Sequence, residues 1–561
     1  MESMYPKDVE ARKGTSPRSG AFEQIRPRPV IVLCAILALA SSAWAQSSPA
    51  SWKKGAVCYE IFVRSFYDSD GDGIGDLKGL TTKLDYINDG NPRSTQSLGA
   101  RCIWLMPVAS SPSYHGYDVT NYYRVNPAYG TNADFRRLVT EAHRRGIKVL
   151  VDLVLNHSSS EHPYFKEALR DTASPHRSWY RWSATNPGIK GPWGQQVWHK
   201  SPVRDEYYYG IFTAEMPDLN YENPLVRQEA ANIAQFWLKT MHVDGFRLDA
   251  VPYLVEAGDR LDHTAGTHTV LREFAASVRR MSPGAFTIGE VWDSIGAQLP
   301  YYPDQLDAYF TFEASDALLH AVRTGSSGTL LAPFLRLQRA LPAERWAPFL
   351  RNHDQTRTLT ALGGDLARAR LAAALLLTLP GLPFVYYGEE IGMSGDKPDP
   401  RLRTPMHWTL GHSAGFTPGD VWETLQPDSL TANVAAQTSD PVSLLNWYRR
   451  LIHLRSSNSA LGSGELVAVD ASSSAVAAYL RRDGTHVVLV IANLGTAPLS
   501  GVSVTSRGRV LTSGHYSPTD LLGGAVTTRL DIGADGVVRE YVPFATLAPM
   551  QTWALELKKP Q

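Results

Sequence analysis

The chain has 561 residues, a length that indicates two or three domains around a large core rather than a small binding module. Lys plus Arg and Asp plus Glu both number 55, so no net charge would draw the protein to nucleic acid or to an anionic membrane surface. Neither of these partners is therefore expected.

The N-terminal residues read as a targeting segment. Six basic residues precede an apolar run at 30–40, and Ala43 and Ala45 supply the small residues of a cleavage site. The apolar run is too short for a stable membrane span. We therefore expect residues 1–45 to be a signal peptide and the mature chain, 46–561, to be secreted, either to the periplasm or to the medium.

Two cysteines remain in the mature chain, Cys58 and Cys102, each within an apolar strand-like run. Two buried free thiols are the favoured interpretation, because a free cysteine packs as a small hydrophobic residue. A disulfide between neighbouring strands is the alternative. The spacing fits neither a metal-thiolate site nor a redox motif.

Short apolar runs then alternate with helical patterns. A helix is expected at 133–145, capped by Asn132, and another at 224–241, with Pro224 in its first turn. This alternation predicts an α/β fold in which a parallel sheet closes into a (β/α)₈ barrel; an open doubly wound sheet is disfavoured because no Gly-rich phosphate turn appears. The candidate strands are 56–63, 101–106, 147–154, 243–248, 285–289, 306–310, 346–350 and 383–387.

Two departures from this alternation divide the chain further. Residues 156–217, after the third strand, are too long for an ordinary connection, and we expect an inserted domain that covers one side of the barrel mouth. From 464 to 561, short apolar runs are separated by Gly-containing turns, which is typical of an antiparallel β-sandwich. The barrel itself would then consist of 46–155 and 218–463.

The strand at 243–248 ends in a pair of opposite charges. Arg247 and Asp249 stand two residues apart, so their side chains should share one face at the strand's C-terminal end. There the guanidinium would keep the carboxylate ionised, as a nucleophile requires. An ordinary structural ion pair at a strand end is the alternative.

Three more predicted strands end in polar residues: His157, Glu290, and the pair His353 and Asp354. In a barrel of this type, the C-terminal ends of all strands meet at one mouth, where catalytic residues lie. Paired carboxylates in different environments are what acid–base hydrolysis of glycosides requires.

These motifs, in this order and spacing over nearly all of 52–560, resemble those of the α-amylase superfamily, glycoside hydrolase family thirteen. The resemblance implies that Asp249 is the nucleophile, that Glu290 is the general acid and then the base, and that Asp354 stabilises the distorted sugar and the transition state. It also implies retention of the anomeric configuration, with the first two carboxyl groups roughly 5–5.5 Å apart.

The same resemblance implies a set of substrate-binding residues. Arg247 would orient the nucleophile, and His157 and His353 would bond hydroxyl groups of the reacting sugar. Tyr117 would stack on that sugar. Arg403, in the segment 403–408, matches a motif of the exo-acting α-glucosidases and trehalose synthases, except that His407 stands where Gln is usual.

The loop after the first strand is rich in Asp and Gly. Its alternate acidic side chains present the hard oxygen ligands that calcium prefers, and four carboxylates without a cation would repel one another. Gly79 at the twelfth position excludes an EF-hand, and a solvated acidic turn is the alternative. Similar loops in the family imply Ca²⁺ bound by four side chains and one carbonyl: Asp68, Asp70, Asp72, Asp76 and the carbonyl of Ile74.

A second calcium site is left open. Many α-amylases carry Lys-His three and four residues after the nucleophile, and the His carbonyl serves that site; here Pro252 and Tyr253 occupy these positions. Asn156, a ligand of that site elsewhere in the family, is present.

We expect a monomeric endo-type α-amylase that cleaves α-1,4 bonds in starch and maltooligosaccharides. Tyr114 stands where exo-glucosidases usually carry an Asp, and residues 88–99 and 289–293 resemble the secreted bacterial α-amylases intermediate between oligo-1,6-glucosidases and neopullulanases. The alternatives are an exo-acting α-glucosidase or oligo-1,6-glucosidase, a trehalose synthase-like glucosyl transferase, and an inactive barrel that serves as a binding subunit.

Overall fold

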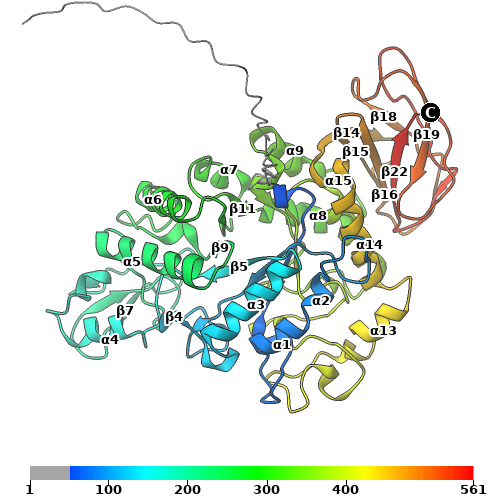
Figure 1. The fold of residues 1–561 in the computed structure, drawn as a ribbon. Helices are drawn as coiled ribbons and strands as arrows, with labels where there is room; N and C mark the ends of the chain where they lie inside the picture. The colour runs from blue at the N-terminus through cyan, green and yellow to red at the C-terminus, as the bar shows by residue number, and fades with distance from the viewer. Residues whose placement is uncertain (1–50, 560–561) are drawn as a thin grey trace, which may run out of the picture. The chain divides into compact units, whose positions relative to one another are not determined.

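The computed structural model describes residues 51–559 of the chain (Figure 1). The predicted signal peptide lies outside the described residues. Within 51–559, no helix is both long enough and apolar enough to cross a membrane.

Eight parallel strands form the central sheet, in the order β12-β11-β10-β9-β5-β2-β1-β13. A parallel bridge between Phe349 and Phe384 joins the two ends of this order, so the sheet closes into a barrel. Each strand lies within one of the eight predicted runs, which confirms the barrel and excludes an open sheet. The strands are β1 (Cys58–Ile61), β2 (Cys102–Leu105), β5 (Lys148–Leu153), β9 (Gly245–Leu248), β10 (Phe286–Gly289), β11 (Ala308–Phe310), β12 (Trp346–Ala347) and β13 (Phe384–Tyr386).

Helices surround the barrel (Figure 1). The longer ones are α3 (Asn132–Arg144), α5 (Pro224–Gln235), α6 (Ala265–Met281), α8 (Phe312–Thr324), α9 (Leu331–Ala340), α11 (Leu366–Thr378) and α14 (Leu444–Ser457). Shorter helices lie around the barrel, in the segment between β5 and α5 (α4), and before the C-terminal sheet (α15): α1 (Leu77–Thr82), α2 (Leu84–Ile87), α4 (Pro163–Arg170), α7 (Ile295–Gln298), α10 (Thr358–Ala361), α12 (Asp399–Leu402), α13 (Val434–Ser439) and α15 (Ser459–Ser463).

The predicted cap of α3 was wrong by one residue. Thr131, not Asn132, is the N-cap, and it forms a reciprocal capping box with Asp134. Asn132 instead accepts a hydrogen bond from the backbone of Val125. Helix α5 begins at Pro224 as predicted, and a π-helical turn at Phe236–Thr240 continues it.

The prediction of two free thiols is overturned. Cys58 and Cys102 are joined by a disulfide, and they are register partners on the adjacent strands β1 and β2. Both are fully buried among the apolar side chains inside the barrel, with Trp104, Phe310 and Phe384 in the same cluster. The alternative interpretation, a disulfide between neighbouring strands, is therefore the correct one.

The segment between β5 and α5 folds as a small excursion with its own sheet. Strands β6 (Trp182–Ser183), β8 (Tyr207–Tyr209) and β7 (Trp198–Lys200) pair antiparallel in that spatial order. Phe165, Tyr180 and Tyr208, the last of them on β8, belong to an apolar cluster separate from that of the barrel.

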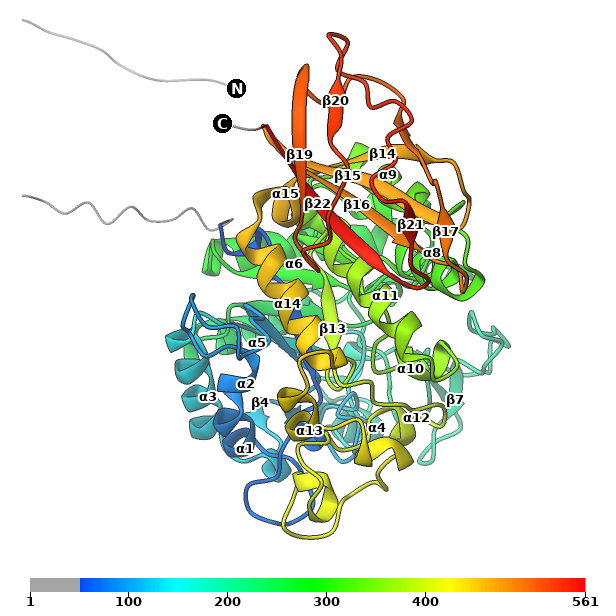
Figure 2. The same ribbon diagram turned by 90° about the vertical axis from the view of Figure 1, so that its right-hand side faces the viewer.

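A seven-stranded antiparallel sheet follows α15, and its apolar residues form a cluster distinct from that of the barrel. Figures 1 and 2 both show α15 beside this sheet, and α15 contacts β15 and β16. The strands, in spatial order, are β18 (Val504–Ser506), β14 (Glu465–Ala471), β15 (Val476–Asp483), β16 (His486–Asn493), β22 (Thr552–Lys558), β19 (Gly514–Asp520) and β20 (Leu530–Ile532). Two short pairs lie apart from the larger sheets: β17 (Leu499–Ser500) with β21 (Thr546–Leu547), and β3 (Ala109–Ser110) with β4 (Asn121–Val125).

Candidate active site

Arg247 lies at the centre of the barrel mouth. Its side chain is 1% exposed, and it contacts carboxylates from three strand ends. One terminal nitrogen, Nη1, donates to Asp152 at 2.9 and 3.0 Å and to Asp249 at 2.6 Å. The other, Nη2, donates to Glu290 Oε2 at 2.7 Å. A rigid planar guanidinium can hold several carboxylates in fixed positions, which the point charge of a lysine cannot do.

The three predicted catalytic carboxylates line one cavity of about 400 Å³. Asp249 and Glu290 are mostly buried, with 11% and 14% of their side chains exposed, and Asp354 is 29% exposed. A second cavity, of about 450 Å³ between α5 and α6, touches only Asp249 of the three, so it is not where they meet.

Asp354 is held by two cationic side chains. Arg403 Nη2 donates to one of its oxygens at 2.9 Å, and the His353 ring lies 3.0 Å from the other. Arg403 also donates to the backbone carbonyl of His353 at 3.1 Å. Arg403 lines the cavity, whereas His353 is fully buried behind it.

Tyr117 lies in the cavity wall, with its ring stacked on that of His353 at an interplanar angle of 13°. The Tyr117 hydroxyl lies 2.7 Å from His353 Nε2 and donates to Asp152 at 3.1 Å. His157 also lines the cavity, and its Nε2 lies 3.1 Å from the Tyr117 carbonyl. The structure thus gathers all eight predicted catalytic and substrate-binding residues at one mouth, six in the cavity wall and two, Arg247 and His353, directly behind it.

The electrostatic environment gives the carboxyl groups of the site different pKa values. Burial, together with repulsion from Asp249 and Asp354, raises the pKa of Glu290 to about 7, although Arg247 opposes this. Burial also disfavours the charge of Asp354, but His353 and Arg403 outweigh it and hold its pKa below the ordinary value. The site therefore offers one carboxyl group that is partly protonated near neutral pH beside one that stays ionised, which is the pattern of an acid–base pair.

His353 carries a positive charge at neutral pH. Burial alone would lower its pKa, but the carboxylates of Asp354 and Glu60 raise it to about 9. Glu60, on β1, contacts His353 Nδ1 at 2.5 Å.

Sequence reasoning missed several residues of this site. Asp152 and Glu60 are charged residues inside otherwise apolar strands, a signal that marks buried functional partners. Two indoles in the cavity wall, Trp193 and Trp292, are 61% and 54% exposed, and they stack on Phe212 and Phe312, respectively. Nothing in their local sequence distinguishes them from core aromatic residues.

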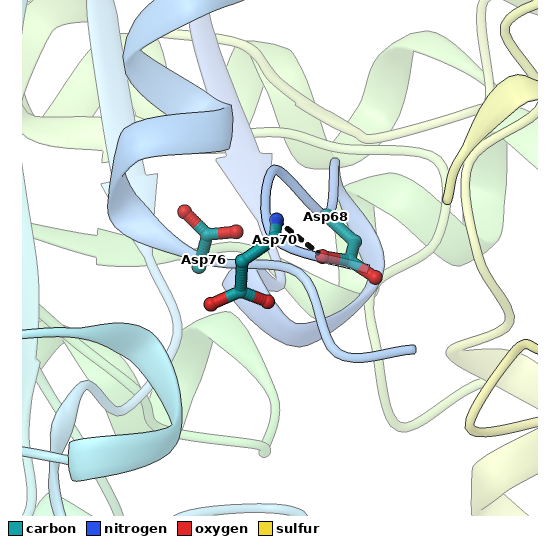
Figure 3. Close-up of side chains that lie close together, drawn as sticks. All are labelled: Asp68, Asp70 and Asp76. Carbon is teal, nitrogen blue, oxygen red and sulfur yellow. Dashed lines mark hydrogen bonds between the residues drawn. The ribbon is translucent and has the colours of Figure 1, made fainter. Parts of the chain in front are cut away.

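The acidic loop lies between β1 and α1. Carboxylate oxygens of Asp68, Asp70 and Asp76 all lie within 4.8 Å of one another (Figure 3). Asp68 is almost fully buried and accepts backbone N–H groups from three residues of the loop, which hold its carboxylate in place. Burial and the neighbouring carboxylates raise the pKa of Asp70. The group can hold a hard cation, and the side chain of Asp72, another predicted ligand, does not belong to it.

The fold and this site define a barrel enzyme whose acid–base carboxylates meet at the C-terminal rim of the strands. The model of the alpha-amylase catalytic domain matches residues 60–464. The chain therefore belongs to the alpha-amylase family, and it is an enzyme that acts on glucosidic bonds, as the sequence predicted.

Individual relatives agree with this assignment. Alpha-amylase 3 of Dictyoglomus thermophilum is 39% identical over 451 residues, which cover 79% of this chain and 85% of that protein. Trehalose synthase/amylase TreS of Mycolicibacterium smegmatis is 35% identical over 514 residues, covering 80% and 85%. Among solved structures, an alpha-amylase from H. orenii is similar with a TM-score of 0.79 at 39% identity, covering 90% of this chain and 100% of that one.

Proposed function

We propose that this protein is a secreted, retaining endo-type α-amylase that cleaves α-1,4-glucosidic bonds in starch and maltooligosaccharides. The observation that carries the proposal is the contact of one buried guanidinium, Arg247, with both Asp249 and Glu290 at the wall of a single cavity. Two carboxylates on neighbouring nitrogens of one group stay close together, and close spacing is typical of retaining glycosidases.

In this mechanism, an Asp249 oxygen attacks the anomeric carbon while the bond from that carbon to the leaving oxygen breaks. Glu290 gives its proton to the leaving oxygen, and a covalent glycosyl ester forms on Asp249. Water then attacks the same carbon, Glu290 takes a proton from it, and the ester breaks. The pKa of about 7 suits Glu290 to both roles.

The other residues act on the sugar and on its developing charge. Asp354, kept ionised by His353 and Arg403, stabilises the positive charge of the oxocarbenium-like transition state. Tyr117 stacks on the reacting ring, and His157 bonds its hydroxyl groups. His353 donates from behind this wall and fixes the position of the Tyr117 hydroxyl.

Endo-type cleavage is supported by the exposed indoles of Trp193 and Trp292. Indole faces suit the apolar faces of sugar rings. Both indoles lie in the same cavity as the carboxylates, so the cavity offers stacking surfaces for further sugar units besides the one for the reacting sugar. An exo-acting glucosidase or a glucosyl transferase is the second candidate. The Asp399 carboxylate also lines the cavity, 3.6 Å from Arg403, where it can grip a terminal sugar.

We also propose that the acidic loop binds calcium. Asp68, Asp70 and Asp76 supply hard carboxylate oxygens at one point, and Asp72 and the Ile74 carbonyl are the further predicted ligands. A bound Ca²⁺ would neutralise the mutual repulsion of these carboxylates and stabilise the loop; it takes no part in the reaction.

Export of the chain has support from the disulfide between Cys58 and Cys102, because disulfides persist in oxidising compartments such as the periplasm or the medium. The protein is proposed to act as a monomer.

A timed product analysis on soluble starch, maltose, isomaltose and pullulan tests the proposal. An endo-acting α-amylase releases a spread of maltooligosaccharides from starch at early times. Glucose alone from starch, glucose from isomaltose, or trehalose from maltose would contradict endo-type hydrolysis and favour the second candidate.

A further inference from the structure

A buried polar cluster lies at the junction of the barrel and the excursion, next to His157 but outside the catalytic cavity. We call it the junction cluster; its members are Asn156, Arg181, Tyr209, Asp218 and Glu256. Asn156, Tyr209 and Asp218 are at most 2% exposed, and the Glu256 side chain is 9% exposed. Among the residues that the structure describes, Asn156 Oδ1, Asp218 Oδ2 and the Tyr209 hydroxyl have no hydrogen-bond partner.

The backbone around the cluster ties three parts of the chain together. Asp218 forms an antiparallel bridge with His157, and Leu219 donates to the Asn156 carbonyl at 2.9 Å. Tyr209 donates to the Arg181 carbonyl at 3.1 Å, and its own carbonyl accepts from Asp218 at 3.1 Å. The strand end that carries His157 is therefore paired directly with the segment that carries Asp218.

The charges of the cluster are unbalanced without Arg181. Burial and repulsion from Glu256 raise the pKa of Asp218 well above its ordinary value; the Ile211 N–H, Asn156 and then Arg181 act against this. Arg181 Nε lies 2.8 Å from Glu256 Oε2, and Arg181 Nη2 lies 3.2 Å from the more exposed Glu222. Removal of the Arg181 guanidinium would leave buried carboxylates without a counter-charge, which would lower the stability of the folded protein.

The resemblance noted above associates Asn156 with a second calcium site, but the residues here do not fit a second metal. Calcium takes six to eight oxygen ligands. In this chain a guanidinium already contacts Glu256, its charge repels a dication, and Pro252 and Tyr253 replace the Lys-His pair.

We propose that Arg181 is the built-in cation of this junction, a positioning residue that pairs with Glu256, offsets the buried negative charge beside Asp218, and so keeps the strand end of His157 in place without a metal ion. The inference rests on the proposed role of His157 in binding the sugar. It predicts that the junction is independent of calcium, in contrast to the acidic loop.

The first test compares Arg181→Met, Arg181→Lys and a matched control, Arg177→Met, in the mature enzyme. Arg177 also pairs with a carboxylate, Glu206, within the excursion, and its side chain forms no hydrogen bond or ion pair with the junction cluster in the part of the chain that the structure describes. Arg181→Met should lower Tm by about 5 °C and kcat/KM on maltoheptaose by about tenfold. Arg181→Lys should have smaller losses of Tm and kcat/KM than Arg181→Met. Arg177→Met should change Tm with little effect on kcat/KM.

The second test measures Tm with EDTA and with added CaCl₂ in an Asp70→Asn background, which disables the acidic loop. With Arg181 present, CaCl₂ should leave Tm unchanged. A rise in Tm there would overturn the inference, because it would show that a metal binds beside Arg181. So would wild-type Tm and kcat/KM in Arg181→Met, or equal damage in the Lys and Met variants.

If Arg181→Met does not fold, the Arg181→Lys variant and the calcium measurement still test whether Arg181 takes the place of a metal ion at the junction. Failure of the proposed glycosidase activity is a separate outcome: the wild-type enzyme would then be inactive on maltoheptaose, while the Tm comparisons would still test the structural role of Arg181.

Discussion

At the scale of the residue, Glu290 shows how the surroundings of one side chain set its pKa and therefore its chemistry. It contacts Arg247, which favours its ionised form, yet burial and two neighbouring carboxylates raise its pKa to about 7. Burial, the largest cause, and repulsion from Asp249 and Asp354 together thus outweigh the attraction of the shared Arg247 cation.

The rate should follow this pKa. Glu290 is protonated below about pH 7 and loses its proton above it, so kcat/KM on maltooligosaccharides should fall as pH rises through about 7. Glu290→Gln should lower kcat by several orders of magnitude and remove this limb, because the amide neither gives nor takes the proton.

A matched control is α-maltosyl fluoride, whose leaving group departs without a proton. The Gln variant should form the glycosyl-enzyme from the fluoride far faster than from maltooligosaccharides. Equal loss on both substrates, or a wild-type alkaline limb in the variant, would contradict the role of Glu290 as the acid.

Single residues differed in how well sequence could place them. Asp249, Glu290 and Asp354 were predicted to meet because each follows a strand, and the closed barrel brings strand ends to one rim. Glu60 and Asp152 were not predicted as site residues, because their partners His353 and Arg247 lie 293 and 95 residues away in sequence. Only the tertiary fold pairs them.

The acidic loop is the element whose behaviour can be tested separately. If Asp68, Asp70 and Asp76 hold calcium, exhaustive EDTA treatment should lower Tm, and a metal present at 100 times its Kd would contribute about 2.7 kcal/mol. Differential scanning calorimetry with and without EDTA measures the effect.

Asp70→Asn should lower Tm and abolish the EDTA response. Asp483→Asn, an exposed acidic residue at the hairpin between β15 and β16, is the control and should retain the full response. An unchanged Tm after EDTA treatment of the wild-type protein would count against a structural metal in the loop.

Elements with strong periodicity were predicted best. The range of α3 was predicted closely, and Phe135, Leu138 and Val139 are buried as its apolar periodicity requires, but its cap was wrong, since Thr131 and Asn132 are both good capping residues. The sheet of the excursion was not predicted, because strands of two or three residues are too short to show alternation.

At the scale of the whole molecule, the disulfide links two adjacent barrel strands that lie 44 residues apart in sequence. Cys58→Ala with Cys102→Ala should lower the free energy of unfolding by about 2–4 kcal/mol, because the unfolded chain gains the freedom of the opened loop. Urea unfolding measures this change, and the wild-type protein unfolded with a reductant serves as its control.

Thiol titration of the unfolded, unreduced protein gives the decisive count for that prediction. No free thiol from Cys58 and Cys102 is expected in the mature chain. Two free thiols would restore the interpretation that the structure overturned.

The barrel as a whole was predictable because its eight strands carry clear apolar runs separated by helical patterns. The domain boundaries at 155, 217 and 463 stay predictions. The state of the cysteines was not decided by sequence, because their pairing depends on the register of β1 against β2, which only the closed barrel defines.

The most direct measurement is to trap the covalent intermediate with a 5-fluoro-maltosyl fluoride and to map the modified peptide by mass spectrometry. The account predicts one added maltosyl-type group per chain, attached to Asp249, and none in an Asp249→Ala variant that keeps the wild-type Tm. Attachment at Glu290 or Asp354, or turnover without any covalent species, would contradict it.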